Sequence, residues 1–461
     1  MSSLSTSRMP KSTPSRLQGF PLPEFDWDHQ QFCREDENTS WVEDNYIGSE
    51  TPLDAFLGIF DPSPRSTYEK PIISSICNDD ALETLRDDIK SVPDTLAAWL
   101  DERSLLGGPR KGNGPVLAGG LYGKLKRKRF QEYDVPDAET RRIYMPDPGT
   151  WAVAALIWTA SPTFAPIFRD LLWKHLMSHR SFTATFSPGP FAFKLEFHIP
   201  YYVWEEGNDI RRDVRIKPNG DPLRSSTNLS SLLSQSFSGD RGPPDCLYEA
   251  QTSLVVSGPN SSVWTACLLT DTYFKDQTDV NDEELLSYHE AAWINDGLYY
   301  DPLASGEIDA TVPIWNPREY YCLVLMIRIK QIKEEWVRIV YHLKNRMDAH
   351  LQKHGASRST DASFLRSSQS QSVAFDKTYH WIKQMANLLN GFIDTLSEVL
   401  ESWTCFSNGD ISLFANGASY KLKLSIHNIN TIMDTELRGV LTELCSLRTR
   451  LERFRAVEFH F

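Results

Sequence analysis

Cysteine is scarce in this chain, and the few that occur form no recognisable pattern. Seven cysteines are scattered over 461 residues, and no two of them form a C-x-x-C pair. An odd, dispersed set is not typical of a disulfide framework or of a structural zinc site. We therefore expect a protein of a reducing compartment that folds on its hydrophobic core, which a chain of this length can make large.

Signature motifs of catalysis are also missing. The sequence has no Gly-x-Ser-x-Gly elbow, no dinucleotide fingerprint and no context for a cysteine or histidine nucleophile. A glycine-rich stretch over 107–124 lacks the spacing of a phosphate loop, and Leu125 stands where a hydroxyl should bind magnesium. We expect a mobile loop there. His175 and His179 lack the adjacent glutamate of a zinc protease, so we expect surface or core histidines.

Long hydrophobic runs are nearly absent. The one uncharged stretch long enough to cross a bilayer, residues 148–168, is interrupted by Pro162 and Pro166. We expect a buried helix that ends near Ser161, followed by a second helix that starts around Pro162. The sequence therefore predicts no integral membrane segment.

Positive charge is in deficit, with 48 Lys and Arg against 61 Asp and Glu and a net charge of −13. Such a chain repels phosphate backbones on average, so we expect no nucleic-acid partner. One basic run is typical either of a nuclear-import cluster or of a solvated charged segment. It consists of Lys126, Arg127, Lys128 and Arg129. We expect a cytoplasmic protein, with nuclear import as the alternative.

The composition along the chain divides it into three parts. Residues 1–65 begin with a Ser/Pro/basic tail without the apolar stretch of a secretory signal, and continue as an acidic segment with aromatic residues. We expect a disordered tail, and an acidic segment that is either a solvated lead-in or a strap over the fold. Residues 66–312 predict a mixed α/β domain, and residues 313–461 predict a bundle of long helices.

Hydrophobic periodicity predicts the elements of the α/β domain. Strict alternation over 191–199 indicates a half-buried strand. Two further apolar segments, 248–258 and 261–274, flank a Gly-Pro-Asn sequence and indicate a hairpin. Residues 163–180 predict a helix.

The last third of the chain repeats apolar residues every three or four positions over 317–354, 373–404 and 424–456. Asn316 is the expected N-cap of the first segment, and Gly355 its C-terminal stop. The fold class we expect is α+β, with a small mixed β-sheet domain followed by a long antiparallel three-helix bundle and a disordered N-terminal tail. The apolar seams of these coiled-coil-like helices could instead bind a protein partner or a second copy of the chain.

Two acidic stretches match parts of cation-binding patterns. Six residues are candidate metal ligands: Asp79, Asp80, Glu83, Asp279, Asn281 and Glu283. The first three match the D-D-x-x-E pattern by which terpene cyclases hold magnesium, or simply favour the dipole of a predicted helix over 79–92. The last three, together with Glu290, follow a calcium-loop pattern in which Glu284 replaces the required turn glycine, and the alternative is a generic divalent-cation patch in the acidic stretch 271–309. The sequence predicts no cofactor and no catalytic or cofactor-binding residue, with Mg²⁺ as the alternative if these acidic residues bind a cation.

Five blocks of sequence carry a resemblance. They are PTFAPIFRDLLWKHL (162–176), KLEFHIPYYVWEE (194–206), DPLRSSTNLSSLL (221–233), YEAQTSLVVSG with WTACLLTDTYF (248–258 and 264–274), and PIWNPREYYCLVLMIRIKQIKEEW (313–336). Together they resemble a family of uncharacterised fungal proteins, some of which look like the soluble part of CorA-type magnesium channels. The resemblance spans about residues 115–457. It implies a fungal source and an α/β domain that feeds a long stalk helix.

The chain departs from the channels in its membrane part. It has no Gly-Met-Asn motif, and nothing after Leu451 could form the two membrane helices. The resemblance therefore carries over no ion-conducting residue. Three functions stay open: a non-enzymatic interaction or scaffold protein, which we favour; an enzyme or accessory factor of fungal specialised metabolism; and a cation-sensing CorA-like module without a pore.

Overall fold

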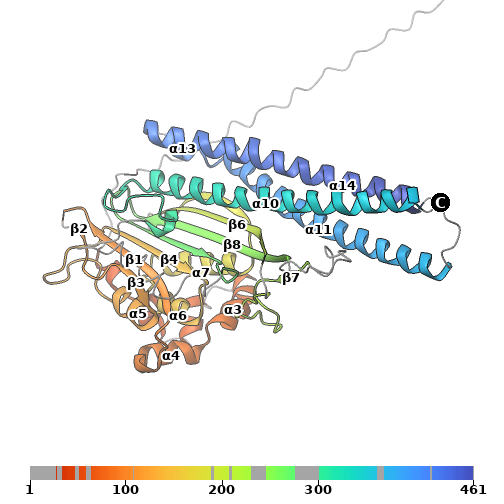
Figure 1. The fold of residues 1–461 in the computed structure, drawn as a ribbon. Helices are drawn as coiled ribbons and strands as arrows, with labels where there is room; N and C mark the ends of the chain where they lie inside the picture. Colours follow the sequence, from red (N-terminus) through yellow and green to blue (C-terminus); the bar gives the residue numbers. More distant parts are fainter. Residues whose placement is uncertain are drawn as a thin grey trace, which may run out of the picture.

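A mixed β-sheet lies at the centre of the computed structural model, with helices on both of its faces (Figure 1). The structure describes residue 27 and residues 34–46, 51–58, 64–106, 108–187, 192–206, 210–229, 245–275, 301–360, 368–415 and 418–459. The predicted disordered tail, residues 1–20, lies outside the described residues. So does the stretch that contains Asp279, Asn281 and Glu283.

Nine strands form this sheet in the order β2-β1-β4-β9-β8-β6-β5, with β3 paired to β1 and β7 paired to β8. The strands are β1 (Leu96–Ser104), β2 (Gly108–Pro109), β3 (Gly114–Leu117), β4 (Thr140–Pro146), β5 (Ser181–Ser187), β6 (Ala192–Glu206), β7 (Ser226–Asn228), β8 (Asp245–Gly258) and β9 (Trp264–Thr270). Strands β4 and β9 run parallel, and the other pairings described are antiparallel. The predicted hairpin of β8 and β9 is confirmed.

The first layer of helices comes from the N-terminal half of the chain. Its members are η1 (Asp36–Asn38), α1 (Trp41–Asn45), α2 (Pro52–Leu57), α3 (Pro64–Ile76), α4 (Asp79–Asp87), η3 (Ile89–Ser91), α5 (Ala118–Leu125), α6 (Thr150–Thr159) and α7 (Ala165–Leu176). Residues 152–158 of helix α6 are all buried in this layer, as expected for a helix that is apolar on every side. The predicted break between α6 and α7 is confirmed, and none of the described helices is long and apolar enough to span a membrane.

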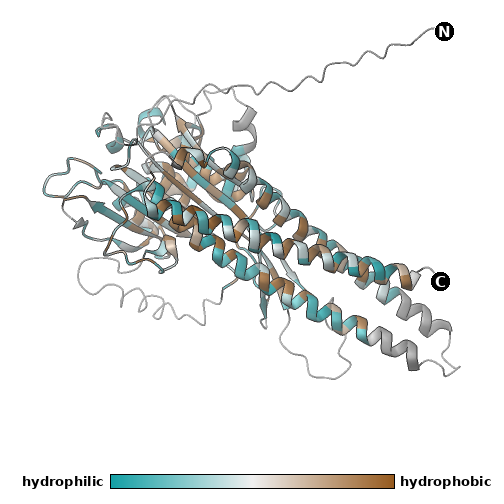
Figure 2. Cartoon of the chain, turned by 90° about the horizontal axis from the view of Figure 1, so that it is seen from above, coloured by the Kyte–Doolittle hydropathy of each residue, from teal (hydrophilic) through white to brown (hydrophobic). Residues whose placement is uncertain are grey.

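The second layer comes from the C-terminal third and covers the opposite face of the sheet (Figure 1). Its members are η4 (Pro302–Ala304), α10 (Pro317–Thr360), α11 (Ser368–Asn408), α12 (Ser412–Ala415), α13 (Tyr420–Thr431), the π-helical turn η5 (Ile432–Leu437) and α14 (Arg438–Phe459). Helix α13 packs on α10, and α14 packs on α11. Apolar residues recur along the long helices, as the brown stretches between teal ones in Figure 2 show.

The long helices and the sheet share one hydrophobic core. Phe197 and Leu254 from the sheet belong to the same buried cluster as Tyr321, Trp336 and Leu343 of α10. The apolar seams predicted from the sequence are therefore buried inside the chain. The predicted boundary between residues 312 and 313 separates two parts that pack against each other through this core.

Local capping signals of these helices are only partly reliable. The Asn316 side chain accepts a hydrogen bond from the Arg318 backbone N–H at 3.0 Å, which confirms the predicted N-cap. Gly355 does not end α10, because the helix continues to Thr360. A single glycine lowers helix propensity but does not stop a helix unless the chain turns there.

Two corrections concern segments expected to be irregular. Part of the predicted disordered and acidic segment 1–65 is folded, because Phe56 is fully buried and the Trp41 indole N–H donates to the Ala55 carbonyl at 3.0 Å. This arrangement fits the strap alternative. The predicted loop over 107–124 is wrong for residues 118–124, which belong to helix α5 and pack Leu121 into the core.

Candidate functional site

A buried charge centre lies where β9 ends, around the carboxylate of Asp271. The Arg224 Nε–H donates to one carboxylate oxygen at 2.6 Å, and an Arg215 N–H donates to the other at 2.7 Å. The backbone N–H of Gln251 adds a third hydrogen bond at 2.8 Å. Burial by itself would raise the pKa of Asp271, but the two guanidinium groups hold it well below its ordinary value.

The same carboxylate belongs to a serine–histidine–aspartate arrangement. His175 on α7 places Nε2 3.3 Å from Asp271 and Nδ1 3.1 Å from the Ser253 hydroxyl. Burial lowers the pKa of His175 to about 4, so the imidazole is neutral at pH 7. In hydrolases this order of residues activates the serine towards a substrate carbonyl. Here His175 and Ser253 are both fully buried, so no substrate can reach them and the contacts instead join α7 to the sheet.

Arg224 explains why this centre forms. Its guanidinium also donates to the carbonyl of His175 at 2.6 Å and to the carbonyl of Leu176 at 3.1 Å, which are the last two residues of α7. A cation at this end satisfies free carbonyl groups and the helix dipole. The sequence alone does not reveal the centre, because Arg224 and Asp271 are 47 residues apart.

A second buried charge centre lies on the polar side of β6. Glu196 accepts hydrogen bonds from Lys174 at 2.6 Å and from Thr183 at 2.7 Å, and Lys194 pairs with it at 3.1 Å. Burial opposes ionisation, but His198, whose Nε2 lies 3.6 Å from the carboxylate, and the ammonium groups of Lys194 and Lys174 hold the pKa of Glu196 well below its ordinary value. The strand predicted to be half-buried is thus covered on both faces, because its polar side chains pair beneath α7.

The basic run does not present four exposed cations. Arg129 is 2% exposed and donates to the Thr265 hydroxyl at 2.9 Å and to the Trp264 carbonyl at 2.8 Å. Lys126 pairs with Glu43 at 2.8 Å. Arg129 thus anchors the end of the run to β9 instead of facing solvent.

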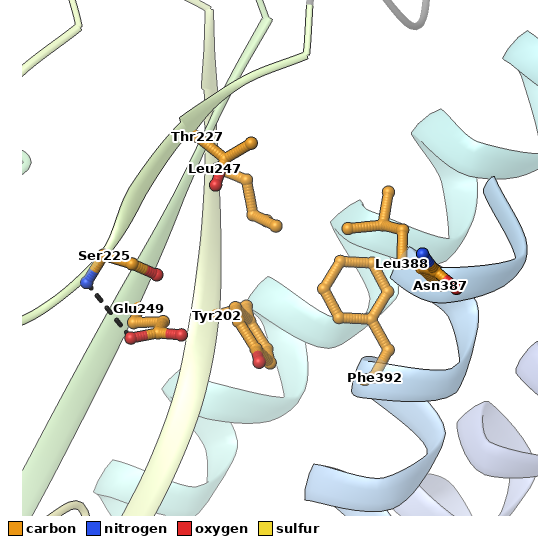
Figure 3. Close-up of a pocket in the computed structure, with 9 residues that line it drawn as sticks. Tyr202, Ser225, Thr227, Leu247, Glu249, Asn387, Leu388 and Phe392 are labelled. Atoms are coloured by element: carbon orange, nitrogen blue, oxygen red, sulfur yellow. Dashed lines mark hydrogen bonds between the residues drawn. The ribbon is translucent and has the colours of Figure 1, made fainter. Parts of the chain in front are cut away.

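A pocket of about 160 Å³ lies between the sheet and α11 (Figure 3). It is lined by Tyr202, Ser225, Thr227, Leu247, Glu249, Asn387, Leu388, Gly391 and Phe392. Its base is apolar, because Leu247 and Phe392 are buried there. Its rim is polar and open to solvent, because Ser225, Thr227 and Asn387 are exposed.

Two contacts fix the shape of this pocket. The rings of Tyr202 and Phe392 meet edge to face, with their centroids 4.9 Å apart. The Glu249 carboxylate accepts a hydrogen bond from the Ser225 backbone N–H at 3.1 Å, which holds it at the rim. Gly391 leaves the α11 side open, since a Cβ atom there would meet no heavy atom within 4 Å. No sequence motif marks this site, because strand and helix residues meet there only in the folded chain.

The predicted metal ligands that the structure describes do not converge. Asp79 accepts a hydrogen bond from the Leu53 backbone N–H at 3.0 Å, which ties α4 to α2. Asp80 and Glu83 join it in no group of three metal-ligating side chains. Over the described ranges one such group occurs, and it consists of Glu206, Asp245 and His342. Asp279, Asn281 and Glu283 stay predictions outside the described residues.

Comparisons with known proteins add no family to this picture. Neither the models of protein families nor the curated protein sequences contain a match to this chain.

Proposed function

We propose that this chain is a non-enzymatic interaction protein that takes an apolar side chain of a protein partner into the pocket between the sheet and α11. The observation that carries the proposal is the pocket itself, with its apolar base and its exposed polar rim. A cavity of about 150 Å³ holds a benzene ring, so this pocket has the size for one aromatic or branched aliphatic side chain. Side chains buried in such pockets commonly dominate the affinity of an interface.

The negative charge at the pocket rim indicates which residues should lie beside the anchoring side chain of the partner. The Glu249 carboxylate lies at the rim, and the chain as a whole carries a net charge of −13. A partner segment with a lysine or arginine beside its apolar anchor would complement both. Opposite charge mainly accelerates association, and salt weakens it.

The state of the ionisable groups also supports a binding role. The carboxylates of Asp271 and Glu196 are paired with cations in the interior, where they stabilise the fold. These carboxylates therefore form ion pairs with neighbouring side chains and are not available to a substrate. The enzyme alternative would need a reactive group that meets solvent, and the pocket rim offers Glu249 alone among acids.

The long helices hold the α11 side of the pocket in place against the sheet. We infer that α10, α11 and the α13–α14 pair form the antiparallel three-helix bundle expected from the sequence, laid against the sheet. Because the seams are buried in the shared core, a partner would bind at the pocket and not along the seams.

Two glycines allow a direct test. Gly391 lines the pocket, whereas Gly439 lies in α14, and a Cβ atom would meet nothing within 4 Å at either position. Gly391→Trp should fill the pocket, while Gly439→Trp adds the same bulk elsewhere. Affinity purification from the native host should recover the same partner at equal yield with the wild type and Gly439→Trp, and lose it with Gly391→Trp. Equal recovery with both variants, or recovery of the protein alone in every case, would contradict the proposal.

A further inference from the structure

A separate group of polar side chains lies where the longest strands end against α10. Glu206 is the last residue of β6 and Asp245 is the first residue of β8, and the two are paired across the sheet. His342 of α10 completes the group. Each residue offers one ligand atom, and the three atoms lie within 4.8 Å of one another.

Neighbouring side chains orient two of the three ligands. The Asp245 carboxylate is 5% exposed and accepts hydrogen bonds from the Trp204 indole N–H at 3.0 Å and from Arg346 at 2.8 Å. The His342 ring stacks on Trp204, with centroids 5.1 Å apart and planes 8° from parallel. Carboxylate and histidine ligands in metal sites are generally held by such outer contacts.

The ligand types select a class of cation. One imidazole nitrogen and two carboxylate oxygens suit Zn²⁺ and similar divalent transition metals, which leave a further position for water in open sites. Mg²⁺ and Ca²⁺ prefer oxygen ligands alone. Tetrahedral zinc ligands lie about 3.3 Å apart. His342 Nδ1 and Glu206 Oε1 are 3.8 Å apart, and the Glu206 side chain is 49% exposed, so it can move closer.

We infer that Glu206, Asp245 and His342 form a binding site for a divalent transition metal that joins the ends of β6 and β8 to α10. The site is independent of the proposed pocket function. Arg346 competes with the metal for Asp245, because its guanidinium holds one carboxylate oxygen. Its side chain is 42% exposed and can therefore turn into solvent when a cation binds.

Calorimetry with Zn²⁺ on the full chain, freed of metal by a chelator, tests the inference. We expect one Zn²⁺ per chain, with binding weakened roughly tenfold or more in His342→Ala and in Glu206→Gln. Arg346→Gln keeps a donor for Asp245 but removes the competing charge, so its affinity should rise several-fold. His427→Ala, which removes an exposed histidine of α13, should leave the affinity unchanged.

The same site should give Co²⁺ a visible absorption band that His342→Ala abolishes. Because Glu206 and His342 are partly exposed, their variants should keep the wild-type circular dichroism spectrum. The inference is overturned if Zn²⁺ fails to bind, if all variants bind it equally, or if millimolar Mg²⁺ displaces it.

Discussion

Single charged residues of the interior are stable there because neighbouring groups of opposite charge compensate the cost of burying them. Asp271 is fully buried, and Arg215 and Arg224 beside it are 4% and 1% exposed. Removing one member of a buried ion group leaves the others without compensation. The centre therefore fixes the geometry of the 210–229 segment against the sheet, although none of its residues can reach a substrate.

Asp271→Asn should lower the free energy of unfolding by about 3–5 kcal/mol, because two buried guanidinium groups would lose their counter-charge. Urea denaturation followed by tryptophan fluorescence measures this loss. The matched control is Asp434→Asn, which breaks the exposed pair with Arg438. That pair should contribute less than about 1 kcal/mol. Equal losses in the two variants would show that the Asp271 centre does not stabilise the fold.

His175 predicts a loss of stability in mild acid. Its pKa is about 4 in the folded chain against an ordinary value of 6.5, so the unfolded chain binds more protons between these values. Stability from this group is complete above pH 6.5 and is lost as the pH falls towards 4, by at most about 1.4 kcal/mol per pH unit. Burial lowers the pKa of His198 in the same direction.

His175→Gln should therefore remove part of the pH dependence and leave the share of His198. Urea denaturation at pH 7, 6 and 5 gives the slope for both proteins. An unchanged slope in the variant would mean that His175 is not the buried neutral group described here.

Individual helices differ in whether their own sequence or their packing in the folded chain determines their conformation. The 317–354 and 373–404 helices are predictable because a three-to-four residue spacing is a property of the sequence itself. In the structure the first continues to Thr360, and the second runs from Ser368 to Asn408. The Asn316 cap is predictable for the same reason, because it depends only on residues that are neighbours in the sequence. The helical state of 118–125 is not, since three glycines oppose it and burial of Leu121 and Leu125 favours it.

Two glycines should respond to the same change with opposite signs. In Gly258→Ala the new Cβ would lie 2.1 Å from the Val263 carbonyl oxygen, so the β8–β9 hairpin must distort. We expect a loss of about 1–3 kcal/mol in the free energy of unfolding. In Gly439→Ala the Cβ meets nothing, and a better helix former in α14 should add about 0.5–1 kcal/mol. Thermal denaturation of both variants measures these changes. A stabilised Gly258→Ala would contradict the close contact between residue 258 and the Val263 carbonyl oxygen.

At the scale of the whole molecule, the sheet depends on helices that come after its last strand, since β9 ends at Thr270 whereas α10 begins at Pro317 and α11 at Ser368. Its order and its two covered faces could not be predicted, because they depend on long-range pairings such as that of β4 with β9, which joins residues 140–146 to residues 264–270. The pocket and the Asp271 centre escape prediction for the same reason. What the sequence does predict are the helical and strand segments from which these sites are assembled.

The shared core predicts that residues 66–312 do not fold alone. Without α10 and α11 the sheet would expose Phe197, Leu254 and Leu268, which are all fully buried in the whole chain. The isolated segment should be aggregated or give a poorly dispersed amide NMR spectrum, whereas the full chain gives a dispersed one. A soluble, well-dispersed segment would establish the boundary at 312 as a true domain boundary.

The measurement that tests the binding function most directly is photo-crosslinking in the native host. A photoreactive side chain would replace Asn387 at the pocket rim in one experiment and Glu443, exposed on α14, in another. We expect a covalent adduct with one partner from position 387, and none from position 443. Gly391→Trp should abolish this adduct. No adduct from 387, or the same adduct from both positions, would contradict the proposal that the pocket between the sheet and α11 binds a partner.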